Sequence, residues 1–243
     1  MNAANYDLEA HRARAAMALQ MGPEHLPIPA RAVLALGAVG AVPGGTSVVE
    51  GGEIPYRPEA LAKKKDNQEH WLERDPEIKC YLPGVPRATY QPMPFQIFHS
   101  KTSILIAYEF AAAVRNIYLK DPGPAPTDTW MGQSVGHWEN DTLVVEVSSL
   151  NDQTWFDRSG NFHSDKLKVT ERYTRTGPDH LRYEATIDDP DTFTKPWTIS
   201  MPLYRRMEKD AQFMEFKCID FVEELMYGQW RPPAQQKLLG GSR

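Results

Sequence analysis

Apolar and polar residues alternate along most of the chain after Phe95, at the two-residue spacing of β-strands. Short polar turns such as Asn140-Asp141 join most of these runs, and no helix of crossover length separates them. The pattern therefore predicts a mainly β protein, an antiparallel meander closed into a barrel. Up to nine strands are predicted, at residues 95–100, 102–109, 113–120, 131–138, 142–149, 166–175, 180–187, 196–205 and 211–218.

The first 94 residues follow another pattern. Apolar residues recur at helical spacing in 6–20, and Pro58 begins a second predicted helix that ends at Leu72. Prolines in 80–94 exclude a central strand, so we expect an extended arm wrapped over the main body. The predicted organisation has three parts: an N-terminal helical and proline-rich arm (1–94), a β-barrel ligand or catalytic domain (95–219), and a short C-terminal helix with a tail (220–243).

Three predicted apolar strand faces are interrupted by an ionisable residue. The alternation points His99, Arg115 and Glu171 toward the side on which the apolar residues lie. Charged groups in an interior are costly unless they pair with each other or meet a ligand. Two interpretations remain open: a buried Arg115–Glu171 ion pair that fixes the strand register, or a barrel with a polar pocket.

The longest connection between predicted strands is the segment 151–165. It combines three aromatic residues, three aspartates and a histidine. Long loops in a compact meander are often functional, so we expect this one to close the mouth of the barrel and to bring Asp157 or His163 to a ligand. The alternative is a rigid loop in which both residues only satisfy backbone donors.

These positions fit general acid–base catalysis, which needs an acid and a base with tuned pKa values in a dry pocket. We predict a cofactor-independent lyase or isomerase that transfers a proton on a small hydrophobic carbonyl, aromatic or terpenoid compound. The alternative is a non-catalytic carrier of such a molecule. The candidate catalytic residues are Glu171, Asp157, His163 and His99, and the candidate substrate-binding residues are Arg115, Tyr108, Trp130, Trp155 and Tyr173.

The sequence gives weaker support for a nucleophilic serine, a metal site or cysteine chemistry. Residues 132–136 read GQSVG, but a nucleophile elbow needs a helix after the serine, and Ser134 lies in a predicted strand. A metal set of two histidines and a carboxylate could use His99 and His163, although we expect no metal. The two cysteines, Cys80 and Cys218, are either buried thiols or, in an oxidising compartment, a disulfide.

Charge and hydropathy restrict the partners. The net charge is −5 and no basic stripe is present, which argues against nucleic acid. No apolar run reaches the roughly 18 residues that a membrane helix needs, so we expect no membrane insertion. A hydrophobic small molecule is the expected partner, and a homodimer is left open. The sequence as given has no leader, which predicts a soluble, cytoplasmic protein.

Several motifs together resemble an uncharacterised family of bacterial hypothetical proteins, many of which carry export leaders. The resemblance spans about residues 75–220 and implies no established activity, and exported relatives make a periplasmic location an alternative. At the level of the fold alone, the meander also resembles lipocalin barrels. The matching runs are KCYLPGVPR at 79–87, PFQI at 94–97, TWMGQSVGHW at 129–138, DTLVV at 141–145, NDQTWFD at 151–157, HSD at 163–165 and TIDDP at 186–190.

Overall fold

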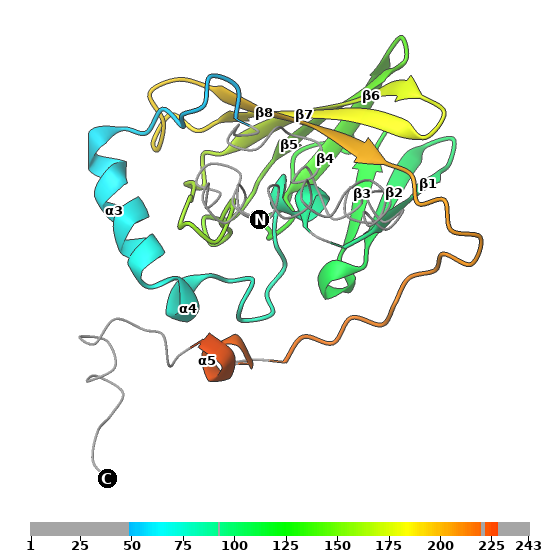
Figure 1. Cartoon of the computed structure of the whole chain (residues 1–243). Helices are drawn as coiled ribbons and strands as arrows, with labels where there is room; N and C mark the ends of the chain where they lie inside the picture. The colour runs from blue at the N-terminus through cyan, green and yellow to red at the C-terminus, as the bar shows by residue number, and fades with distance from the viewer. Residues whose placement is uncertain (1–48, 92, 220–221, 228–243) are drawn as a thin grey trace.

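The computed structural model describes residues 49–91, 93–219 and 222–227 and contains one eight-stranded sheet (Figure 1). The strands follow one another across the sheet in chain order, which confirms the mainly β class. They are β1 (Phe95–His99), β2 (Ser103–Tyr108), β3 (Val114–Tyr118), β4 (Gln133–Glu139), β5 (Thr142–Ser148), β6 (Lys168–Gly177), β7 (His180–Asp188) and β8 (Trp197–Tyr204).

The prediction of a purely antiparallel meander is wrong at one place. β3 pairs with β4 in parallel, through Ile117 opposite Ser134 and Tyr118 opposite Val135. Parallel neighbours need a connection of about a dozen residues or more to return the chain to the starting end. The segment between β3 and β4 has this length, and it carries the chain back without a helix.

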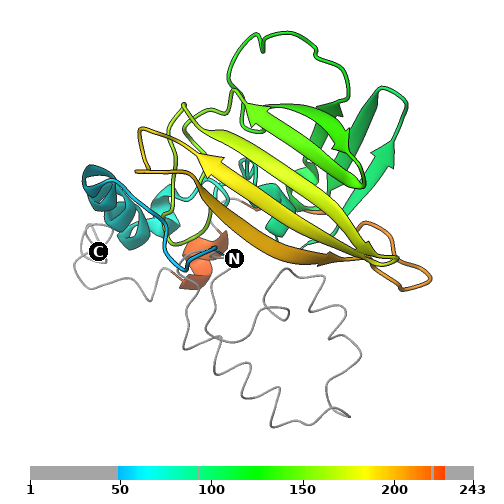
Figure 2. The ribbon, with the colours of Figure 1, turned by 90° about the horizontal axis from the view of Figure 1, so that it is seen from above.

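The sheet curls strongly, so that its concave face is partly enclosed (Figure 2). The predicted closure into a barrel is not confirmed, because within the described ranges no ladder joins the outer strands β1 and β8. The ninth predicted strand, 211–218, is also wrong, since this segment has no regular structure. Its backbone is engaged elsewhere: the N–H of Met214 donates to the Glu109 carboxylate at 2.9 Å. Cys218 forms a disulfide with Cys80, which fastens the segment to the arm.

The helices are short and lie beside the sheet. The predicted helix from Pro58 is present as α3 (Pro58–Glu69), and after a break at His70 the chain continues as α4 (Trp71–Arg74). The predicted helix at 6–20 lies outside the described residues. The remaining helical segments are the 3₁₀ turns η2 (Arg87–Tyr90) and η3 (Phe110–Ala112), and α5 (Val222–Tyr227).

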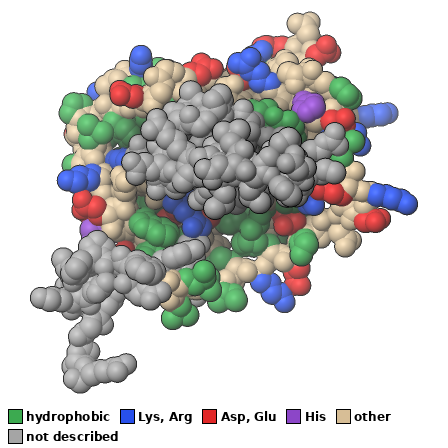
Figure 3. Space-filling view, in the orientation of Figure 1, with side chains coloured by type: hydrophobic (Ala, Val, Ile, Leu, Met, Phe, Trp, Pro, Cys, Tyr) green, Lys and Arg blue, Asp and Glu red, His purple; other side chains and the backbone are tan. Residues whose placement is uncertain are grey.

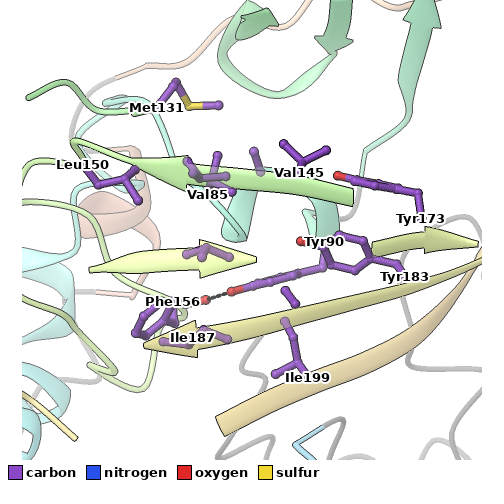
Figure 4. Close-up of a cluster of buried hydrophobic side chains, with 14 of the residues drawn as sticks. Val85, Tyr90, Met131, Val145, Leu150, Phe156, Tyr173, Tyr183, Ile187 and Ile199 are labelled. Atoms are coloured by element: carbon purple, nitrogen blue, oxygen red, sulfur yellow. Dashed lines mark hydrogen bonds between the residues drawn. The ribbon is translucent and has the colours of Figure 1, made fainter. Parts of the chain in front are cut away.

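The sequence predicts that the proline-rich segment before β1 wraps over the main body as an extended arm, and the structure differs. Instead the segment enters the concave face of the sheet, where Val85, Ala88 and Tyr90 belong to the main core (Figure 4). The Tyr90 hydroxyl donates to the carbonyl of Phe156 at 2.8 Å, which ties the segment to the β5–β6 loop. Proline excludes a central strand but permits tight turns, and η2 is such a turn. We call residues 83–91 the plug.

The two ends of the sheet differ. Because β4 to β8 pair antiparallel, the β4–β5 and β6–β7 turns lie at one end, the turn end, and the β5–β6 and β7–β8 connections lie at the other, the loop end. Figure 1 shows α3 beside the loop end. There Trp197 packs edge-on against Phe156 and Phe193, with ring centroids 5.5 and 5.4 Å apart. Aromatic packing thus fills the loop end.

Acidic and basic side chains are interspersed around the edge of the face seen in Figure 3. Among the helices that the structure describes, none has the length and apolar character required to span a membrane.

Candidate functional site

Two adjoining cavities lie on the concave side at the turn end. The turn-end cavity has a volume of about 780 Å³, with walls from β1, β2, β5 and β7 and a rim from the neighbouring turns. The edge cavity, also about 780 Å³, lies between β1 and β8 and reaches the end of the plug. Ile97, Arg175, Gly177 and Leu181 line both cavities, so the two adjoin each other.

Apolar side chains make up the wall of the turn-end cavity. The strand alternation places them there, because inward positions on neighbouring strands of a curled sheet converge. The lining residues of this type are Ile97, Ile104, Ile106, Leu143 and Leu181. Tyr173 of β6 is the one candidate substrate-binding residue in this lining, and His99 is the one candidate catalytic residue.

Glu171 lies in the interior beside Tyr173 and is fully buried. One carboxylate oxygen accepts hydrogen bonds from the hydroxyls of Tyr183 at 2.7 Å and Tyr173 at 3.1 Å. The other oxygen forms an ion pair with Arg115, whose Nε donates to the Ser134 hydroxyl at 2.8 Å. Arg115 belongs to β3 and Glu171 to β6, which are not neighbours in the sheet. The ion pair therefore joins distant parts of the sheet, and a buried Arg115–Glu171 pair is what one sequence interpretation predicts.

This arrangement holds Arg115 in its charged form and the two tyrosines in their protonated form. Burial alone would lower the pKa of Arg115, but the charge of Glu171 holds that pKa well above its usual value. Burial, together with the same carboxylate, raises the pKa of Tyr173 and Tyr183 well above their usual value. Both hydroxyls therefore remain protonated donors. Glu171 has its acceptor capacity occupied, which does not suit a free general base.

A second layer of hydroxyls connects this cluster to the plug. The Thr89 hydroxyl lies 3.4 Å from the hydroxyls of both Tyr108 and Tyr173. Tyr108, a candidate substrate-binding residue, is buried beneath the hollow, and burial raises its pKa. The polar cluster thus reaches both cavities: Thr89 lines the edge cavity and Tyr173 lines the turn-end cavity.

His99 is exposed at the rim of the turn-end cavity. Its ring lies 6.1 Å from that of Trp138, which is 51% exposed and belongs to the same lining. The other ionisable groups in this lining are Asp141, from the β4–β5 turn, and Arg175, from β6. An imidazole and a carboxylate therefore border one apolar hollow.

Asp157 lies at the loop end, in neither cavity lining, and is fully buried. Its carboxylate accepts from the Ser159 N–H at 2.8 Å and from the Asn161 amide at 2.7 Å. Burial raises its pKa against these hydrogen bonds. These contacts are typical of an aspartate that stabilises a turn. They agree with the alternative in which the loop is rigid and Asp157 has a structural role.

His163 is also buried at the loop end, and it lines neither cavity. Nδ1 lies 2.8 Å from the Ser164 carbonyl and Nε2 lies 2.6 Å from the Thr154 hydroxyl. Because a carbonyl can only accept, Nδ1 carries the proton and Nε2 accepts from Thr154. Burial lowers the pKa of the ring, which keeps this neutral tautomer.

The β5–β6 loop, which contains both residues, packs against α3. Gly160 has a φ of +77°, and a Cβ at this position would lie 2.6 Å from the backbone nitrogen of Gln68. Trp155 is buried in a small cluster with Ala60 and Phe162. The half-buried Trp130 stacks on Tyr81 with ring centroids 4.9 Å apart. Neither candidate tryptophan lines the turn-end or the edge cavity.

Among the buried polar residues that sequence reasoning misses, two lie in the plug and have unusual surroundings. Arg87 is 1% exposed and pairs with Asp75 and Glu77. Gln91 is 3% exposed and lines the edge cavity, and neither atom of its amide has a hydrogen-bond partner in the described part of the chain. Both residues fall in proline-rich sequence without periodicity, so no pattern marks them as inward-facing.

Within the described ranges, no group of three or more histidine, cysteine, aspartate or glutamate residues converges as a metal site would require. Comparisons with protein-family models, with curated proteins and with solved structures found no match. The resemblance to an uncharacterised bacterial family therefore stays a prediction, and the argument for function rests on the geometry of the two cavities.

Proposed function

We propose that this protein binds a small, largely apolar molecule in the turn-end cavity. The observation that carries the proposal is a hollow of about 780 Å³ in the concave face of the sheet, with apolar side chains in its wall and polar ones such as His99, Asp141 and Arg175 at its border. Its volume falls in the range of cavities that hold ligands of drug-like size. This architecture, a curled and mostly antiparallel sheet around a hollow with an apolar wall, would serve a carrier or sensor.

The positions of the candidate catalytic groups favour binding over catalysis. Asp157 and His163 are engaged at the loop end, and Glu171 is engaged with Arg115 and two tyrosines. His99 is the one member of this set in a cavity lining. A binding protein needs few polar contacts in its cavity, whereas proton transfer needs a positioned acid and a positioned base.

A cofactor-independent lyase or isomerase is the second candidate. It is favoured by His99 and Asp141, which border the same cavity from β1 and from the β4–β5 turn. In that case His99 would exchange a proton with a carbonyl, aromatic or terpenoid substrate at the rim. Turnover of a metabolite library that is lost in His99→Ala would favour this candidate over a carrier.

The test of the first proposal is titration with N-phenyl-1-naphthylamine, a neutral apolar fluorophore. We expect saturable binding that Leu181→Trp weakens at least tenfold, since the larger ring fills space lined by Leu181. Leu61→Trp is the matched control, because Leu61 is 50% exposed on α3 and lines neither cavity. Absence of saturable binding, or equal weakening by both variants, would refute the proposal.

A further inference from the structure

The amide of Gln91 is the strongest unexplained feature of the hollow. Its nitrogen and its oxygen are both buried, and both lack a partner among the described residues. Burial of an amide without hydrogen bonds costs roughly 1–3 kcal/mol in protein mutational data. A group of this kind is retained in a fold where something outside the chain satisfies it. The edge cavity, which Gln91 lines, is the place from which such a partner can reach it.

The residues around Gln91 indicate what kind of ligand could satisfy its amide. Thr89, 3% exposed, lies beside it in the floor of the edge cavity. Phe95, Ile97 and Leu181 line the same cavity and lead toward the turn-end cavity, with which it shares Ile97 and Leu181. A ligand would match these residues if its polar head lay at the plug and its apolar body extended from there toward the turn-end cavity.

The amide of Gln91 favours a neutral head group that both accepts and donates, because it offers a donor nitrogen and an acceptor oxygen. A carboxylate would accept from the amide nitrogen but has no hydrogen to donate to the amide oxygen, which would stay unsatisfied. The arginines of this lining have partners at the rim. Arg175 donates to the backbone carbonyls of Gly177 and Pro178. Arg206 donates to Glu208 at 3.3 Å, and Arg205 lies 3.9 Å from Asp179.

We propose that the edge cavity binds the head group of a neutral carboxamide through Gln91. The ligand carbonyl accepts from the Gln91 amide nitrogen, and the ligand N–H donates to the Gln91 amide oxygen. The apolar body then passes Ile97 and Leu181 into the turn-end cavity. This inference rests on the proposed binding function and adds the chemical class of the ligand.

Three ligands with one tail test the inference: octanamide, octanoate and methyl octanoate, each measured by displacement of N-phenyl-1-naphthylamine. We expect the wild type to bind octanamide about tenfold or more tightly than methyl octanoate, because the ester can accept but cannot donate. Gln91→Leu should bind the two equally. Gln96→Leu is the matched control, since Gln96 lines the same cavity but is exposed on β1, and it should keep the preference.

A stability measurement gives an independent readout. Replacement of a buried amide that lacks partners by an apolar group of similar size should raise the melting temperature of the ligand-free protein. Gln91→Met serves the same purpose if Gln91→Leu does not fold. A lower melting temperature in the variant that folds would show that the amide is already satisfied in the native state, for example by water, and would overturn the inference.

The outcomes separate this inference from the proposed function. Equal affinity of the wild type for all three ligands, or tighter binding of octanoate, overturns carboxamide recognition and leaves apolar binding in place. Failure of N-phenyl-1-naphthylamine to bind at all overturns the proposed function itself. Loss of the amide preference in Gln96→Leu as well as in Gln91→Leu would show a general effect on the cavity, which also counts against Gln91.

Discussion

The loop end and the turn end of the sheet contain similar kinds of buried polar group in opposite states. At the loop end, Arg87 donates to both carboxylate oxygens of Asp75, at 2.8 and 2.9 Å, and it also pairs with Glu77. At the turn end, Gln91 has no partner for either atom within the described chain. Only three residues of the plug lie between Arg87 and Gln91.

The difference shows that burial of a charged residue is a weak marker of function, whereas an unsatisfied group beside a cavity is a stronger one. Asp157, His163 and Glu171 are buried and ionisable, yet each is engaged by the protein. Arg87 Nε, Arg115 Nη1 and Trp197 Nε1 also lack partners in the described structure, but none of these residues lines the turn-end or the edge cavity. Arg115 lines a smaller cavity of about 220 Å³, and its other nitrogens are engaged by Glu171 and Ser134. Gln91 combines an unsatisfied group with a cavity.

The largest effect is expected where the loop-end network loses its cation. Arg87→Met would leave Asp75 fully buried without a counter-charge, and we expect a loss of about 3–5 kcal/mol in the free energy of unfolding. Urea denaturation measures this loss. Binding of N-phenyl-1-naphthylamine by the folded fraction should not change, since Arg87 lines neither cavity.

Arg158→Met is the matched control, because Arg158 pairs with the same Glu77 at 3.0 Å but its side chain is 37% exposed. A partly solvated pair contributes at most about 1 kcal/mol. Similar losses in the two variants would contradict the view that the buried position of Arg87, and not its charge alone, makes the loop end rigid.

The second largest effect is expected at acidic pH, which should lower the free energy of unfolding through the loop-end carboxylate Glu77. Burial raises the pKa of Glu77, but the charges of Arg87 and Arg158 outweigh it and lower that pKa to about 2. The folded pKa lies below the unfolded one, so the stability contribution is complete above about pH 4.5 and is lost as the pH falls toward 2. The loss is about 3 kcal/mol at 1.36 kcal/mol per pKa unit. Urea titrations between pH 6 and pH 3 should show this decline, and Glu77→Gln should flatten it.

Residues on strands and residues in the plug also differ in how well they can be predicted from the sequence. Alternation along β3 and β6 is enough to predict inward-facing Arg115 and Glu171, because side-chain direction in a strand is local. The parallel β3–β4 pair cannot be predicted in this way, since both strands would show the same alternation in either direction. Gln91 lies in coil, where no period exists, and its burial depends on the entry of the plug into the concave face. The apolar wall of the turn-end cavity thus follows from the strand pattern, whereas Gln91, the residue on which head-group recognition depends, is not visible in the sequence.

The third largest loss in the free energy of unfolding is expected from substitutions in the β5–β6 loop. Asp157→Asn would place a second amide nitrogen against that of Asn161, and His163→Ala would remove the partner of Thr154. We expect each to lower the free energy of unfolding by about 2 kcal/mol while ligand affinity stays unchanged. Asp165→Asn is the control in the same loop, because Asp165 is exposed and should cost less than about 0.5 kcal/mol. A large fall in activity or affinity at unchanged melting temperature would instead restore the interpretation of the loop as part of a site.

The smallest effect should separate the two tyrosines that donate to the same oxygen of Glu171. Tyr183 is fully buried and donates at 2.7 Å, whereas Tyr173 donates at 3.1 Å and also lines the turn-end cavity. We expect Tyr183→Phe to cost about 1 kcal/mol of stability and Tyr173→Phe to cost less, since the longer hydrogen bond is the weaker one. Both variants should bind N-phenyl-1-naphthylamine as the wild type does, because the probe meets the ring of Tyr173 and the hydroxyl points to Glu171. Weaker binding in Tyr173→Phe alone would show that this hydroxyl leaves Glu171 for the ligand, and the floor of the cavity would then take part in recognition.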